Sequence, residues 1–324
     1  MIERGARVVI QGATGREARM VVRHMLAYGT PIAAGVTPGR GGEEVEGVAV
    51  HDSVEDAVAA GGPIAASLVS VPPAATLDAA CEALAAGVGL LVVATENVPR
   101  LDAARLVARA REHGATVVGP NSVGLIRPGE RMKLGAIGGD DADRAFAPGP
   151  VAVISRSGGL TVETALGLRL AGLGVSTAVS VGGDAIIGTP PAALAERLAA
   201  DPGTRAIVVV GEPGTRHELD LADAIAAGRI GVPVVVHVPG RFMEDFPQGM
   251  RFGHAGAVIG GDDERPGPKL RALAEAGALV AETYGEIVPL VRDALARDHV
   301  PPPIDGGAPM AAGPPAGRVR ASGG

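Results

Sequence analysis

Short runs of β-branched and aliphatic residues alternate along the chain with longer stretches whose apolar positions recur every three or four residues. The first pattern is typical of buried strands and the second of amphipathic helices. In the first half of the chain the strand-like runs lie at residues 6–11, 31–36, 64–71, 90–96 and 116–118. Because helical patterns separate these runs, the alternation predicts an α/β fold with buried parallel strands.

The alternation restarts after a segment rich in Gly and Pro. The second half has strand-like runs at residues 151–154, 177–181, 206–210, 233–237 and 279–280. We therefore expect two doubly wound domains, residues 1–126 and 150–298, joined by a linker at residues 127–149. Residues 299–324 are mostly Pro, Gly and Ala with little to bury, which predicts a disordered tail.

Composition excludes several classes of protein. The net charge is −7 and no block of Lys or Arg occurs, so neither nucleic acid nor an anionic membrane is an expected partner. Cys81 is the single cysteine, which excludes an internal disulfide and a cysteine metal site. The N-terminus lacks a signal-peptide pattern and no apolar run is long enough to span a bilayer, so we expect a cytoplasmic protein.

A glycine turn at residues 12–15 joins the first strand-like run to a helical pattern. Such a turn directs backbone N–H groups and the positive end of a helix dipole at an anion, typically a nucleotide pyrophosphate. A nicotinamide dehydrogenase would carry an acidic residue after the next strand, but Arg40 stands in that region. Arg40 is either a solvated loop residue or the ligand of a ribose phosphate, which both coenzyme A and NADP carry.

Two further segments carry candidate chemistry at strand ends. Thr95-Glu96-Asn97 follows a buried strand, where open α/β sheets bind ligands. Ser157-Gly158-Gly159 gathers hydroxyls and glycine N–H groups at a helix start and predicts a second anion site. A serine N-cap explains one of the hydroxyls but not the whole cluster.

His254 lies in a loop of small residues that leaves room for a large group to approach its imidazole. Imidazole is nucleophilic at neutral pH and can form a covalent intermediate, although a histidine in such a loop is also commonly a hydrogen-bonded structural residue. Glu212 follows another strand-like run, where it is either exposed or accepts a hydrogen bond from a histidine and fixes its tautomer.

Ordered along residues 7–295, these motifs resemble the α subunit of succinyl-CoA synthetase and related NDP-forming acyl-CoA synthetases. The resemblance is carried by many short motifs rather than by one. They are the Gly-x-Thr-Gly turn at 12–15, Val-Thr-Pro-Gly-Arg-Gly-Gly at 36–42, Thr-Glu at 95–96, Gly-Pro-Asn at 119–121, Ser-Arg-Ser-Gly at 155–158, Gly-Gly-Asp at 182–184, Gly-Glu-x-Gly at 211–214 and Gly-His-Ala-Gly-Ala at 253–257.

The resemblance implies a Rossmann-like CoA-binding domain followed by a flavodoxin-like ligase domain. It implies that His254 is a phosphohistidine intermediate oriented by Glu212, that Ser157, Gly158 and Gly159 hold its phosphate, and that no residue of this chain binds a metal. ATP or GTP with Mg would bind an ATP-grasp β subunit in an αβ or α2β2 assembly. Eight residues would contact coenzyme A: Thr14, Gly15, Arg16, Glu17, Arg40, Ala94, Thr95 and Glu96.

The acid that such an enzyme would activate stays open. Val162 stands where succinate enzymes usually carry Tyr beside the substrate carboxylate, whereas Ser157-Gly158-Gly159 is more similar to citryl-CoA synthetase and ATP-citrate lyase. We expect a di- or tricarboxylic acid–CoA ligase acting through phosphohistidine and an acyl phosphate. The alternatives are an NAD(P)-dependent oxidoreductase and a non-catalytic CoA-binding regulatory protein.

Overall fold

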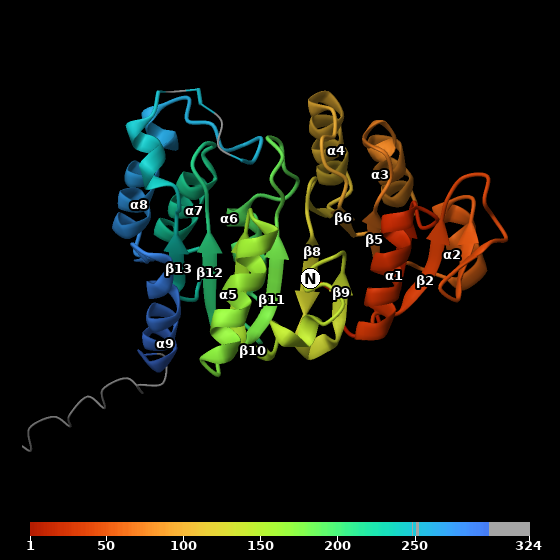
Figure 1. Ribbon diagram of the computed structural model, residues 1–324, viewed down its shortest axis with the longest axis horizontal. Helices are drawn as coiled ribbons and strands as arrows, with labels where there is room; N and C mark the ends of the chain where they lie inside the picture. Colours follow the sequence, from red (N-terminus) through yellow and green to blue (C-terminus); the bar gives the residue numbers. More distant parts are fainter. Residues whose placement is uncertain (248, 251–252, 298–324) are drawn as a thin grey trace, which may run out of the picture.

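The computed structural model describes residues 1–247, 249–250 and 253–297, which form two α/β domains side by side (Figure 1). Within these residues the first domain is built on a sheet of seven strands in the order β3-β4-β2-β1-β5-β6-β7, parallel except where β3 pairs with β4. The strands are β1 (Val8–Gln11), β2 (Ile32–Val36), β3 (Glu44–Val45), β4 (Val48–His51), β5 (Ala66–Val69), β6 (Leu90–Val93) and β7 (Thr116–Val118).

The helices of the first domain connect successive parallel strands. Gly29 ends the first helix in the left-handed conformation, at φ 109°, which glycine adopts without the strain of a Cβ atom. Ser53 caps the second helix by accepting a hydrogen bond from the N–H of Asp56. The helices are α1 (Arg16–Tyr28), α2 (Val54–Gly61), α3 (Thr76–Ala85) and α4 (Arg100–Glu112).

The second domain has a sheet of seven described strands in the order β14-β13-β12-β10-β11-β8-β9. Its pairs are parallel except β11 with β8 and β8 with β9. The strands are β8 (Gly124–Arg127), β9 (Met132–Leu134), β10 (Pro148–Ser155), β11 (Val175–Ser180), β12 (Ala206–Val210), β13 (Val234–His237) and β14 (Leu279–Val280). The helices are α5 (Gly158–Leu170), α6 (Pro191–Ala199), α7 (His217–Ala226), α8 (Pro266–Glu275) and α9 (Ile287–Arg297).

Residues 127–149, which the Gly/Pro pattern predicts to be a linker, are folded onto the second domain. They contain β9 and the beginning of β10, and β9 is the edge strand of the second sheet. The sequence pattern does not reveal β9 because its central residue is Lys133, a polar residue that is fully buried here. The Lys133 ammonium donates a hydrogen bond to the Gly139 carbonyl, which offsets part of the cost of burying its charge.

An apolar cluster crosses from one domain to the other. It contains Ile10 and Val92 of the first sheet together with Leu125 and Ile154 of the second. The expected fold class, a Rossmann-like domain followed by a flavodoxin-like doubly wound domain, is confirmed by the two mostly parallel sheets.

Two further expectations concern the C-terminal tail and membrane-spanning helices. The tail predicted to be disordered, residues 299–324, lies outside the described residues. Within the described part of the chain, none of the helices combines the length and the hydropathy that crossing a bilayer requires.

Candidate active site

The glycine turn after β1 is shaped by close backbone packing. Gly12 has φ +83°, and a Cβ at this position would lie 2.1 Å from the carbonyl oxygen of Ser70. Only glycine therefore allows β1 and the segment after β5 to approach this closely. Gly15 then precedes α1 in an extended conformation, so the free N–H groups of the first helical turn face outward at the carboxyl edge of the sheet.

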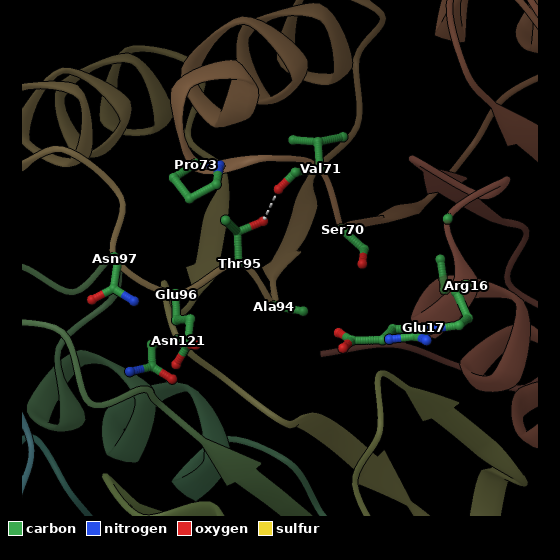
Figure 2. A pocket seen from close by; sticks show the side chains of 12 residues that line it. Arg16, Glu17, Ser70, Val71, Pro73, Ala94, Thr95, Glu96, Asn97 and Asn121 are labelled. Carbon is green, nitrogen blue, oxygen red and sulfur yellow. Dashed lines mark hydrogen bonds between the residues drawn. The ribbon is translucent and has the colours of Figure 1, made fainter.

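A cavity of about 630 Å³ opens at this edge (Figure 2). Arg16 and Glu17 lie at one end of the cavity and Asn97 and Asn121 at the other. The hydroxyl of Thr95 donates a 2.8 Å hydrogen bond to the Val71 carbonyl and so joins the ends of β5 and β6. Six of the eight residues predicted to contact coenzyme A line it: Gly15, Arg16, Glu17, Ala94, Thr95 and Glu96.

The other two predicted residues, Thr14 and Arg40, are not among the residues that line this cavity. Thr14 bonds the hydroxyl of Thr37 at the end of β2, with 3.3 Å between the two oxygens. Arg40 lies in the loop after Thr37 and forms an exposed ion pair with Glu43. Its guanidinium is therefore at the same edge of the sheet, where an approaching anion would compete with Glu43 for it.

In the second domain, three neighbouring strands end at one edge and bring distant residues together. In the sheet β10 lies between β11 and β12, and Ser155 is in register with both Ser180 and Val210. The first few residues after these strands are therefore neighbours, because parallel strands end at the same edge. They include Arg156 after β10, Gly183 after β11 and Glu212 after β12.

His254 is hydrogen-bonded to Glu212 at this edge, with 2.7 Å between Nδ1 and Oε2. The Glu212 carboxylate is buried at 6% exposure, and its other oxygen lies 3.1 Å from a guanidinium nitrogen of Arg156. The structure therefore brings together the two residues that the sequence predicts as a catalytic pair. An ionised carboxylate can only accept hydrogen bonds, so Nδ1 of His254 carries the proton. In the neutral ring, Nε2 then has a lone pair that is not protonated.

Arg156 is a member of this site that the sequence reasoning did not assign. It is 2% exposed, and it donates hydrogen bonds to the carbonyls of Gly182 and Asp184 at 2.9 and 2.8 Å. Its position in the Ser-Arg-Ser motif was the available signal, but only the strand order places its guanidinium beside Glu212. Burial, and secondarily the charge of Arg156, lower the pKa of the nearby His217, which favours its neutral form.

Two glycines allow the histidine loop to pack on this ion pair. A Cβ on Gly183 would lie 2.7 Å from Cδ2 of His254, so the imidazole rests against a bare backbone. A Cβ on Gly256 would lie 2.7 Å from the guanidinium of Arg156. Side chains at either position would displace the ring or the ion pair. Arg251 and Phe252, which precede this loop, lie outside the described residues.

The predicted phosphate-binding segment begins α5. The Ser157 hydroxyl accepts a hydrogen bond from the Leu160 N–H at 3.3 Å, so this serine is the N-cap of the helix. Within the described residues no hydrogen bond joins His254 to Ser157, Gly158 or Gly159. Gly158, Gly159 and Val162 line a separate cavity of about 740 Å³ together with the loop of residues 136–145.

A smaller cavity of about 300 Å³ lies between the domains. Asn97 lines both this cavity and the larger first-domain pocket, and Ala255, next to His254, lines its other side. Asn121 bonds the carboxylate of Asp184, another lining residue, at 3.2 Å. The sequence places Asn97 in the strand-end segment 95–97 but gives it no role of its own. Its left-handed backbone, at φ 58°, is a feature that only the structure reveals.

No cluster of three or more His, Cys, Asp or Glu side chains suited to a metal ion occurs in the described part of the chain. The fold and the site together define a two-domain α/β protein that combines a nucleotide-type cofactor pocket with a carboxylate-bound histidine. Family models agree with this architecture. Residues 3–97 match the CoA binding domain, and residues 148–292 match the succinyl-CoA ligase like flavodoxin domain.

Curated relatives match almost the whole chain. It is 42% identical over 295 residues to a succinate–CoA ligase [ADP-forming] subunit alpha 2 of Archaeoglobus fulgidus, covering 91% of this chain and 99% of that protein. It is 38% identical to a subunit of an ADP-forming sulfoacetate–CoA ligase of Bilophila wadsworthia, covering 91% and 98%. The chain therefore belongs to the family of α subunits of ADP-forming acid–CoA ligases.

A solved structure shows the same fold at lower identity. ATP citrate lyase from Methanothrix soehngenii, determined with citrate and coenzyme A, superposes with a TM-score of 0.84 at 22% identity. The match covers 98% of this chain and 54% of that one, so the chain spans about half of the lyase polypeptide. These matches favour an acid–CoA ligase subunit over the oxidoreductase and the non-catalytic regulator.

Proposed function

We propose that this chain is the CoA-binding, phosphohistidine-forming subunit of an enzyme that joins a small carboxylic acid to coenzyme A. The observation that carries the proposal is the 2.7 Å hydrogen bond from His254 Nδ1 to Glu212. It fixes the tautomer in which Nε2 has a free lone pair, as a nitrogen nucleophile requires. The relatives named as ADP-forming acid–CoA ligases support the joining of an acid to coenzyme A.

In the proposed reaction, Nε2 of His254 attacks the terminal phosphorus of a nucleoside triphosphate, and the nucleoside diphosphate leaves. A carboxylate oxygen of the acid then attacks the phosphorus, which frees the imidazole and gives an acyl phosphate. Finally the CoA thiolate attacks the acyl carbon, and inorganic phosphate leaves. Glu212 accepts the hydrogen bond from Nδ1–H throughout and stabilises positive charge that develops on the ring.

The CoA-binding domain and its 630 Å³ cavity support coenzyme A as the cofactor. We place the pyrophosphate at the first turn of α1, with Thr14, Gly15, Arg16 and Glu17, because free N–H groups gather there. The Arg40 guanidinium would give up its ion pair with Glu43 and bind the ribose phosphate instead. The reactive arm would pass Ala94, Thr95 and Glu96 and reach the histidine loop through the cavity that Asn97 shares.

The nucleotide is expected on an ATP-grasp β subunit, with Mg and either ATP or GTP. We propose that Gly158 and Gly159 at the start of α5 face the phosphate, because helix N-termini attract anions. The acid would bind nearby, in the 740 Å³ cavity that Val162 lines. We propose that the substrate is a small carboxylic acid with a second anionic group. The succinate and sulfoacetate named for the relatives both have this form.

The direct test is to co-express the chain with an ATP-grasp β subunit and supply Mg and nucleotide labelled on the terminal phosphate. We expect acid-labile, base-stable label on the wild-type chain and none on His254→Asn, which keeps a similar shape without the nucleophile. Label that persists on the variant would overturn the proposal. Screening succinate, malate, citrate and sulfoacetate for CoA-dependent release of ADP or GDP then identifies the acid.

A further inference from the structure

Lys269 on α8 is fully buried and points its ammonium at the turn that carries Glu212. Nζ donates to the carbonyls of Glu212 and Gly214 at 2.8 and 2.6 Å, and to a carboxylate oxygen of Glu218 at 2.6 Å. An ammonium has three N–H donors, so these three acceptors satisfy it completely. One buried cation therefore holds the turn after β12 at two backbone carbonyls, those of Glu212 and Gly214.

Glu218 on α7 completes this clamp. Its Oε2 pairs with Lys269, and its Oε1 accepts the backbone N–H of Glu212 at 3.1 Å. The carboxylate packs directly on Gly211, where a Cβ would lie 2.5 Å from Oε1. Both backbone polar groups of Glu212 are thus bonded to the Lys269–Glu218 pair, which leaves its side chain free to contact His254 and Arg156.

A lysine suits position 269 better than an arginine would, because the three acceptors around Nζ lie close together. The chain has 29 Lys and Arg residues, of which only Lys133 and Lys269 are lysine. A guanidinium presents its donors in a planar fork, whereas an ammonium can direct three donors at acceptors that converge on one point. Replacing a buried ion pair by neutral residues of similar volume is often neutral for stability, so stability alone does not call for this pair.

We propose that Lys269 and Glu218 are positioning residues for phosphoryl transfer, acting through Glu212. This role rests on the function proposed for His254. The two residues hold the backbone of Glu212 in place, and the position of that backbone sets the position of the Glu212 carboxylate. The 2.7 Å bond to Nδ1 of His254, and with it the Nδ1–H tautomer, follows from that placement. Loss of the clamp lets the carboxylate move, and displacement of about 1 Å lowers a reaction rate on the order of 100-fold.

The test uses the full chain carrying Lys269→Met and Glu218→Gln together, so that no buried charge is left unpaired. Spectra of ¹⁵N-histidine-labelled protein report the tautomer of His254, whose signal is identified by its loss in His254→Asn. We expect the double variant to lose the Nδ1–H signal of His254 and to form phosphohistidine on the order of 100-fold more slowly with the partner subunit. Its affinity for coenzyme A, which binds the other domain, should equal that of the wild type.

A matched control removes another largely buried ion pair, Arg127–Asp201, by Arg127→Met and Asp201→Asn. This control should keep the tautomer and the phosphorylation rate. If the Lys269/Glu218 double variant does not fold, Gly211→Ala is the milder perturbation, because its Cβ pushes Glu218 away from Glu212 while the pair stays charged. It should give the same loss of the Nδ1–H signal.

The positioning role is refuted if folded Lys269→Met/Glu218→Gln or Gly211→Ala keeps both the wild-type tautomer and the wild-type rate. The tautomer is read from the isolated chain and needs no activity. A wild-type chain that shows the Nδ1–H signal but never takes label would therefore refute the proposed function and leave the positioning of His254 by the clamp standing.

Discussion

Replacing Gly183 by alanine tests whether the placement of the His254 ring controls the reaction. Gly183 is not in the left-handed region, so its backbone accepts alanine without strain. The new Cβ would lie 2.7, 2.9 and 3.0 Å from three atoms of the imidazole. Carbon atoms in contact prefer 3.5–4.0 Å, so the ring must withdraw by about 1 Å.

That displacement is enough to lose the hydrogen bond to Glu212. A bond of 2.7 Å that lengthens by about 1 Å exceeds the range of N–H···O hydrogen bonds. We expect phosphohistidine formation to slow on the order of 100-fold, which corresponds to about 2.7 kcal/mol of activation free energy. The free energy of unfolding should change little. Alanine lowers the conformational entropy of the unfolded chain, which stabilises the protein by about 0.4–1 kcal/mol and offsets part of the cost of moving the ring.

The assay is the single-turnover rate of label incorporation with the partner subunit, combined with the tautomer spectrum of His254. Gly261→Ala is the control, because it lies in the segment after the histidine and a Cβ there meets no atom within 4 Å. A Gly183→Ala protein that is labelled within twofold of the wild-type rate would refute the idea that this contact holds the ring in place.

Three other outcomes follow from single contacts. Burial lowers the pKa of Lys133 from its ordinary value of 10.5 to about 8, so the unfolded chain binds more protons than the folded one between these values. Stability should therefore rise with pH from about 8 to 10.5, by up to about 1.4 kcal/mol per pH unit, in urea unfolding. Arg156→Met leaves the buried Glu212 without its guanidinium and should lower the free energy of unfolding by roughly 3–5 kcal/mol, measured the same way. Arg40→Gln should weaken coenzyme A about tenfold in calorimetry but leave dephospho-CoA unaffected, because only the former carries the ribose phosphate.

Each of these outcomes has its own control. Lys133→Met should flatten the pH dependence, and parallel curves for the two proteins would contradict the assignment to Lys133. Adding Glu212→Gln to Arg156→Met should restore more than half of the lost stability, and no recovery would show that the ion pair is not the cause. Arg23→Gln removes a comparable exposed pair, that with Glu46, and should not alter coenzyme A binding.

The architecture and the outline of the pocket could be predicted from the sequence because both follow local rules. Alternating strand and helix patterns predict parallel sheets, and glycine turns after strands place free N–H groups at one edge. Local rules placed the glycine turn and Thr95 each at the end of a strand, and the family resemblance assigned Gly15, Arg16 and Thr95 to one ligand. All three line one cavity. The strand β9 escaped this reasoning because the buried Lys133 interrupts its apolar pattern, and its carbonyl partner becomes visible only in the fold.

The histidine and its carboxylate were identifiable as residue types, but only the tertiary structure decided how they are held. His254 and Glu212 are 42 positions apart, and Lys269 is 57 positions from Glu212. The strand order of the second sheet makes the ends of β10, β11 and β12 neighbours, which places Arg156 and Gly183 at the same carboxylate and ring. No local pattern encodes such contacts, because they depend on which strands pair and on how closely two backbones approach.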